Sequence, residues 1–165
     1  GGYAVGASGV LFYSFGYLLM TLGTFGVASL YESKVGQEIY IEDLKGLGRK
    51  NLWVSISLSI LLLSLAGIPP TVGFFGKLFI FSAAVQNGLI WLAVWGVINS
   101  VISVYYYLKP IVYMFFSDEE SVLSSGSSKQ LTEFSVGLMA TLVVLIGFMS
   151  SNFYEFVTKS VGQLF

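Results

Sequence analysis

The sequence predicts an all-α integral membrane protein with four transmembrane helices, the second of which is interrupted. Hydrophobic residues make up 55% of the 165 positions and charged residues only 10%, which is not the balance of a water-soluble domain. Most charges gather in two polar segments, and the long apolar runs outside these segments carry very few. Two adjacent prolines, Pro69 and Pro70, interrupt one of the apolar runs. We therefore expect a single membrane domain over residues 1–165.

The lengths of the apolar runs place the spans. A hydrocarbon core of about 30 Å requires roughly 20 residues of helix. The runs then predict spans at about 8–30, 52–85, 89–116 and 134–156. The second run is longer than a single span requires, which indicates a helix that is discontinuous near 67–71. In the first run Gly9, Gly16 and Gly23 recur every seven residues, a spacing that favours close helix packing over a functional role.

The polar segments predict the orientation in the membrane. With four spans, loops 31–51 and 117–133 lie on the same side. That side carries most of the basic residues: Lys34, Lys45, Arg49, Lys50, Lys109 and Lys129, against only Lys159 on the other. The positive-inside rule then places both loops in the cytoplasm or its organellar equivalent.

The interruption follows from the chemistry of proline. Pro69 and Pro70 have no backbone N–H, so the carbonyls of Leu65 and Ala66 lose their usual helical partners. Nearby glycines add backbone freedom and allow water or another helix to approach; they are Gly67, Gly73 and Gly76. Unpaired carbonyls at membrane depth are tolerated only against protein or a wet cavity. The alternative interpretation is a simple proline kink without function.

Lys77 is the main candidate functional residue. It lies about 10 residues, or roughly 15 Å of helix, from the turn at Gln86-Asn87-Gly88, close to half the hydrocarbon thickness. A lysine at that depth costs about 2.5–3.5 kcal/mol on insertion scales, so it is expected to face a polar interior. Together with the broken helix, it is typical of a proton or ion site in a transporter. The alternative is a structural salt bridge to a carboxylate of another subunit.

Polar residues on the third span are weaker candidates. Asn99, Ser103 and Tyr106 are spaced to share one helical face, and Lys109 lies about one turn further on. This face predicts either a hydrated stripe from mid-membrane to the loop side, or interhelical hydrogen bonds ending in an interfacial lysine. Both interpretations remain open.

Composition excludes several chemistries. The chain has no Cys or His, so thiolate iron–sulfur ligation, His-ligated haem and imidazole or thiol catalysis are not available. We expect no catalytic residue set, metal site or cofactor on this chain, and any electron carrier on other chains. The net charge of −1 argues against nucleic acid as a partner.

Two adjacent stretches resemble a known family. "SLAGIPPTVGFFGKLFIF" followed by "AVQNGLIWLAVWGVINSVISVYYYLKPI" is similar to the antiporter-like membrane subunits of respiratory complex I, most of all to the subunit N type. The preceding "FGYLLMTLGTFGVASL" and "IEDLKGLGRKN" fit the same family. The resemblance covers residues 9–116 well and the last helix weakly.

The resemblance implies a role for the chain. Its helices would correspond to helices 11–14 of a fourteen-helix subunit, and Lys77 to the lysine of the second proton half-channel. FMN, iron–sulfur clusters and quinone would be on other subunits of an NADH:quinone oxidoreductase, in a bacterial plasma membrane or a mitochondrial inner membrane. The partners would be lipids, neighbouring antiporter-like subunits and whatever carries the preceding helices.

Three functional hypotheses follow. The chain is part of the proton-translocating arm of a redox-driven pump, a subunit of a multi-subunit cation/proton antiporter, or a membrane scaffold without transport. The partners that accompany it in the membrane separate the first two, and the effect of replacing Lys77 separates the third.

Overall fold

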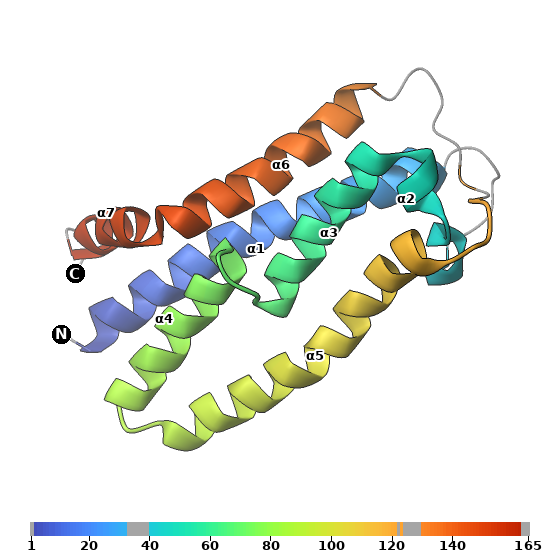
Figure 1. Ribbon diagram of the computed structural model, residues 1–165. Coiled ribbons are helices and arrows are strands. Elements are labelled where there is room, and N and C mark those ends of the chain that lie inside the picture. The colour runs from blue at the N-terminus through green and yellow to red at the C-terminus, as the bar shows by residue number, and fades with distance from the viewer. Residues whose placement is uncertain (1, 33–39, 122, 124–129, 163–165) are drawn as a thin grey trace.

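The chain is α-helical throughout the part that the structure describes. The computed structural model describes residues 2–32, 40–121, 123 and 130–162 (Figure 1). Its elements are α1 (Gly2–Glu32), the 3₁₀ helix η1 (Ile41–Leu44), α2 (Leu47–Lys50), α3 (Leu52–Ala66), α4 (Val72–Gln86), α5 (Ile90–Phe116), α6 (Gln130–Phe148) and α7 (Ser150–Gly162). No strand occurs in these ranges, so the all-α prediction is confirmed for them.

Within the described ranges, three helices are long and apolar enough to cross a membrane. They are Gly6–Tyr31 of α1, Ile90–Phe116 of α5 and Gln130–Phe148 of α6. The region predicted as the second span contains two shorter apolar helices, α3 and α4, which end and begin on either side of the two prolines.

Helix α1 contacts most of the other long helices, namely α3, α4, α6 and α7 (Figure 1). Its glycines with seven-residue spacing lie at these contacts. A methyl group at Gly16 would lie 2.9 Å from Val72 of α4, and one at Gly23 would lie 2.6 Å from Leu61 of α3. Gly9 faces the backbone of α4 at Phe79. The glycines therefore allow α1 to pack closely along both shorter helices.

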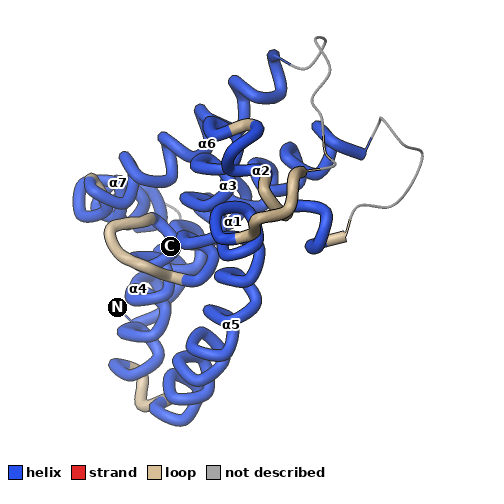
Figure 2. The backbone as a smooth tube through the Cα atoms, turned by 45° about the vertical axis from the view of Figure 1, so that its right-hand side comes forward, coloured by secondary structure: helices blue, strands red, loops and turns tan. Residues whose placement is uncertain are grey.

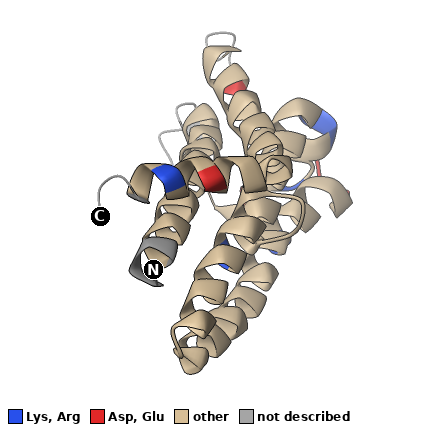
Figure 3. Ribbon diagram, turned by 90° about the vertical axis from the view of Figure 1, so that its left-hand side faces the viewer, with Lys and Arg blue, Asp and Glu red and all other residues tan. Residues whose placement is uncertain are grey.

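The C-terminal end of the fourth predicted span differs from the prediction. The span was expected to continue to about residue 156, but α6 ends at Phe148 and α7 starts at Ser150 in a different direction (Figures 1 and 3). The polar run Ser150-Ser151-Asn152 ends the apolar stretch, and α7 carries both Glu155 and Lys159. Helix α7 thus has the polar and apolar faces of a helix at an interface.

The two polar segments contact one another. Lys45 pairs with Glu119 at 2.7 Å, and Arg49 pairs with Asp118 at 3.1 Å. Lys50 donates to the carbonyl of Ser121 at 2.8 Å. These bonds connect η1 and α2 to the segment after α5. Lys34 and Lys129, which contributed to the predicted orientation, lie outside the described residues.

Candidate functional site

The site is built around the end of α3. Gly67 ends this helix in the left-handed region, with φ of 86°. Its N–H donates to the carbonyls of Leu63 and Ser64, at 3.1 and 2.9 Å, and the N–H of Ile68 also donates to Leu63. The next carbonyls in line, those of Leu65 and Ala66, face positions 69 and 70, where proline has no hydrogen to donate.

Lys77 supplies the missing donor from the other helix. Its Nζ donates to the carbonyl of Leu65 at 2.9 Å and to that of Ala66 at 3.3 Å. The side chain is half-buried. The last carbonyls of a helix carry a partial negative charge, so they stabilise a partly buried ammonium group. One lysine thereby satisfies the carbonyls that both prolines leave free.

The non-helical connection between α3 and α4 is drawn as a loop in Figure 2. The peptide bond between Pro69 and Pro70 is cis. The carbonyl of Ile68 accepts from the hydroxyl of Thr71 at 2.7 Å. Helix α6 approaches the same connection, because a methyl group at Gly147 would meet the carbonyl of Pro70. The connection therefore lies against α6.

The predicted glycines of the break permit three close approaches. A methyl group at Gly67 would lie 3.2 Å from Cδ of Lys77. One at Gly73 would meet the carbonyl of Ser64, and one at Gly76 would lie 2.8 Å from the ring of Tyr13. These glycines thus bring α4 against the end of α3 and against α1.

A cavity of about 380 Å³ adjoins Lys77. It lies between the break and α5, and its walls include Gly67, Phe74, Phe81 and Ser100. Lys77 and Ser100 are the only polar side chains among its lining residues. The cavity is therefore largely apolar, with one cationic and one hydroxyl group.

Other predicted residues of the third span lie away from this cavity. Asn99 is exposed and its amide donates to the carbonyl of Trp95 in its own helix, at 3.0 Å. Ser103 is buried and its hydroxyl donates to the backbone carbonyl of Ser100 at 2.6 Å, and Tyr106 is exposed beside Tyr107. None of the three predicted residues lines the cavity beside Lys77.

Lys109 belongs to the loop-side group of charges. Its Nζ lies 3.8 Å from Glu42 and 5.5 Å from the centre of the Tyr113 ring. It is also absent from the lining of the Lys77 cavity. Helical spacing placed it correctly on α5, but its side chain meets η1.

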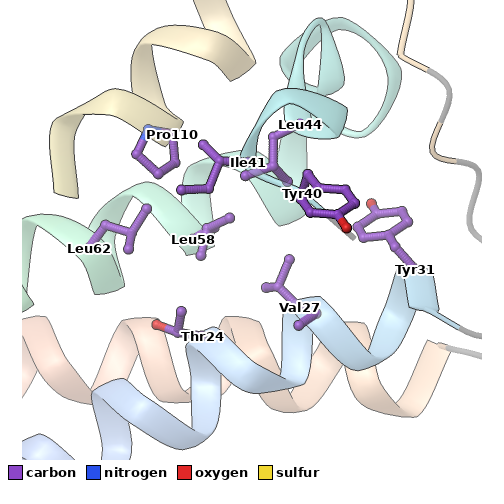
Figure 4. A pocket seen from close by; sticks show the side chains of 10 residues that line it. Thr24, Val27, Tyr31, Tyr40, Ile41, Leu44, Leu58, Leu62 and Pro110 are labelled. Carbon is purple, nitrogen blue, oxygen red and sulfur yellow. The ribbon is translucent and has the colours of Figure 1, made fainter. Parts of the chain in front are cut away.

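A second cavity, of about 210 Å³, lies near the loop end and is almost wholly apolar (Figure 4). Leu58 and Leu62 of α3 and Pro110 of α5 form one wall, and α1 contributes Thr24 and Val27. Tyr31 and Tyr40 lie close to one another at its edge (Figure 4). It contains no lysine or carboxylate. In the part of the chain that the structure describes, no group of metal-ligating side chains gathers.

Ser64 had no separate sequence signal, whereas Ser100 adjoins the polar face predicted on the third span. Both are serines in apolar helices, where such residues also occur as ordinary packing groups. Helix α3 alone also contains Ser55, Ser57 and Ser59. Only the three-dimensional arrangement distinguishes Ser64 from these.

A family model described as "NADH:quinone oxidoreductase/Mrp antiporter, TM" matches residues 2–103. These residues contain α1, both shorter helices, Lys77 and the first half of α5. The chain belongs to this family. With the apolar helices described above, this membership makes it an integral membrane protein.

Members of the family with high identity are bacterial subunits. The NADH-quinone oxidoreductase subunit N of Bdellovibrio bacteriovorus is 46% identical over 158 residues, which are 96% of this chain and 32% of the relative. The subunit N of Cupriavidus taiwanensis is 48% identical over 159 residues, 94% of this chain and 32% of the relative. The chain thus spans about a third of the length of the curated relatives that it matches.

A solved structure has the same fold. Respiratory complex I from Thermus thermophilus with bound aureothin contains a chain that matches with a TM-score of 0.78 at 28% identity. The match covers 90% of the present chain and 34% of the solved chain. The resemblance to complex I antiporter-like subunits, expected from the sequence, is confirmed by both comparisons.

Proposed function

We propose that the chain forms part of the proton-translocating membrane arm of an NADH:quinone oxidoreductase of the subunit N type. The observation that supports this most is the contact of Lys77 with the carbonyls of Leu65 and Ala66, beside a cavity. A titratable group at a broken helix is the arrangement that ion-translocating membrane proteins use.

In this proposal α3 and α4 together form one interrupted span. Each has 15 residues, about 22 Å of helix, which is short of a hydrocarbon core of about 30 Å. With α1, α5 and α6 they make four spans, and loops 31–51 and 117–133 face the cytoplasm or matrix. The direct ion pairs between the two loop segments support their placement on one side.

Lys77 takes up and releases the translocated proton. The carbonyls of Leu65 and Ala66 hold the ammonium form, and a neutral amine keeps two N–H groups for the same acceptors. The cavity beside Ser100 is the space through which a proton carrier reaches Lys77 from α5. We place Asn99, Ser103, Tyr106 and Lys109 further along this route, with smaller individual contributions.

Redox chemistry is proposed for other subunits. NADH oxidation through FMN and iron–sulfur clusters, and quinone reduction, would occur there and drive proton transfer at Lys77. The partners of this chain are the neighbouring antiporter-like subunits, the segment that carries the preceding helices, and membrane lipids. The membrane is a bacterial plasma membrane or a mitochondrial inner membrane.

The test replaces Lys77 in the complete complex. Lys77→Met keeps an unbranched side chain of similar length and removes the titratable group. We expect assembly to be unchanged and the initial rate of proton pumping in proteoliposomes to fall at least threefold. Lys159→Met, at an exposed position of α7, is the control and should pump normally. Normal pumping by assembled Lys77→Met complex would contradict the proposal and favour a scaffold.

A cation/proton antiporter is the second candidate, because the family description includes the Mrp antiporters. Mass spectrometry of the complex after gentle solubilisation separates the two. Flavin and iron–sulfur subunits among the partners support the redox-driven pump. A set of antiporter subunits without them would leave the proton role of Lys77 and remove its redox drive.

A further inference from the structure

Ser64 connects the two short helices in the direction opposite to Lys77. Its side chain belongs to α3 and is 0% exposed. Its Oγ accepts a hydrogen bond from the backbone N–H of Gly73, in the first turn of α4, at 3.2 Å. It therefore satisfies one of the N–H groups that lack a partner within the first turn of a helix.

Helix α4 needs this bond because its own capping residue does not cap it. Thr71 stands at the N-cap position, where a threonine hydroxyl usually accepts from the first turn. Here the hydroxyl of Thr71 donates to the carbonyl of Ile68 at 2.7 Å instead, and makes no capping bond. A serine from α3 takes over this function across the break.

The side-chain hydrogen bonds between α3 and α4 run in both directions. Lys77 extends from α4 and binds the C-terminal carbonyls of α3, while Ser64 extends from α3 and binds an N-terminal N–H of α4. Gly73 and Lys77 are four residues apart, so they share one face of α4. A bond that fixes Gly73 against Ser64 thereby also sets the direction in which Lys77 points.

We propose that Ser64 is a positioning residue for Lys77: its hydroxyl holds the first turn of α4 where the ammonium group reaches the carbonyls of Leu65 and Ala66. The absence of a side chain at Gly73 is part of the same arrangement, because a methyl group there would meet the carbonyl of Ser64 and lie 3.0 Å from its Oγ. The inference rests on the proposed proton role of Lys77.

The experiment compares serine variants of the complete complex in proteoliposomes. Ser64→Ala removes the hydroxyl, and Ser64→Thr and Ser64→Cys keep a group that can accept a hydrogen bond. Ser55→Ala is the matched control, because Ser55 is also 0% exposed in α3 but its hydroxyl donates to the carbonyl of Asn51, at 2.9 Å, and not to α4. Pumping is measured per assembled complex, so that a loss of assembly alone does not lower it.

We expect Ser64→Ala to lower pumping per assembled complex about three- to tenfold, the effect of losing one buried hydrogen bond. Ser64→Thr or Ser64→Cys should recover at least half of the rate, and Ser55→Ala should pump normally. Normal pumping by Ser64→Ala overturns the inference. A loss that neither Ser64→Thr nor Ser64→Cys recovers assigns the effect to packing and overturns it as well.

Measuring Lys77→Met in the same preparation distinguishes a failure of the proposed proton role of Lys77 from a failure of the positioning role of Ser64. If Lys77→Met pumps normally, the proposed function fails whatever Ser64 does. If Lys77→Met is defective and Ser64→Ala is normal, the proton role stands and only the positioning role of Ser64 fails.

Discussion

Lys77 donates a hydrogen bond to the carbonyl of Leu65, 2.9 Å away on the other side of two prolines. An intact helix would satisfy this carbonyl with the N–H of residue 69. The lysine thus occupies the place of a main-chain donor, and the end of α3 accepts a titratable group in place of an amide. A substitution at either partner should therefore change both the stability of the end of α3 and the pumping that depends on the charge of Lys77.

Gly67→Ala should lower both the stability of the protein and its pumping rate. The φ of 86° at Gly67 is unfavourable for alanine by about 1–2 kcal/mol, and the new methyl group would lie 3.2 Å from Cδ of Lys77. We expect a lower thermal stability and a lower pumping rate. Thermal unfolding of the solubilised complex and proteoliposome assays measure these. Gly6→Ala is the control, since a methyl group there has no neighbour within 4 Å; equal behaviour of the two variants would exclude a special role for Gly67.

Lys109→Ala should have a smaller effect than Lys77→Met. Lys109 lies 3.8 Å from Glu42 at the loop end, in a partly exposed pair of the kind that contributes about 0–1 kcal/mol. We expect the pumping rate to fall about twofold, while Lys77→Met loses much more. Wild-type rates in Lys109→Ala would reduce Lys109 to an interfacial anchor. A loss as large as that of Lys77→Met would place it on the main proton route.

Lys45 should titrate above an ordinary lysine. The hydrogen bond that the Lys45 ammonium donates to the Glu119 carboxylate, at 2.7 Å, raises the pKa of Lys45 above 10.5. Because the folded pKa is raised, the pair is at full strength below pH of about 10.5 and weakens as the pH rises through the raised pKa. NMR of ¹³C-methylated lysines follows this titration. Glu119→Gln should lower the pKa of Lys45, whereas Glu120→Gln should leave it unchanged; no difference between them would contradict the pairing.

Asn51→Ala should destabilise the start of α3. The Asn51 side chain accepts from the N–H of Val54 at 3.3 Å, and its amide donates to Glu133 of α6 at 3.0 Å. Loss of such a cap costs about 1 kcal/mol. We expect a lower unfolding temperature of the complex without a change in pumping at low temperature. Asn87→Ala is the comparison, since the Asn87 amide donates to the carbonyl of Ala83 in the preceding turn. If the unfolding temperature of Asn87→Ala were as low as that of Asn51→Ala, the result would argue against the capping role of Asn51.

The ends of the helices near the prolines could be predicted because proline has no N–H. The same reasoning identified the carbonyls of Leu65 and Ala66 as groups without helical partners, and depth identified Lys77 as a costly charge. That these groups bind one another could not be predicted, because it depends on the direction in which α4 leaves the connection. The role of Ser64 was hidden for the same reason.

Other differences have equally local causes. Apolar residues such as Phe153 and Phe156 occur again after the polar run at 150–152, so the predicted span was continued past Phe148, where α6 ends. Helical spacing placed Asn99 and Tyr106 on one face of α5, but spacing does not say which face the neighbouring helices cover. Lys109 was expected on the proton route, and its proximity to Glu42 depends on how η1 folds back on α5.

The bonds across the break also bear on how the protein enters the membrane. Ser64 and Gly73 are 9 residues apart, and Lys77 and Leu65 are 12 apart. Both contacts are local, so the two short helices can form them as one hairpin-like unit while the chain is still being synthesised. In the proposed arrangement, the lysine could then enter the bilayer already bound to main-chain oxygens, since neither contact requires α6.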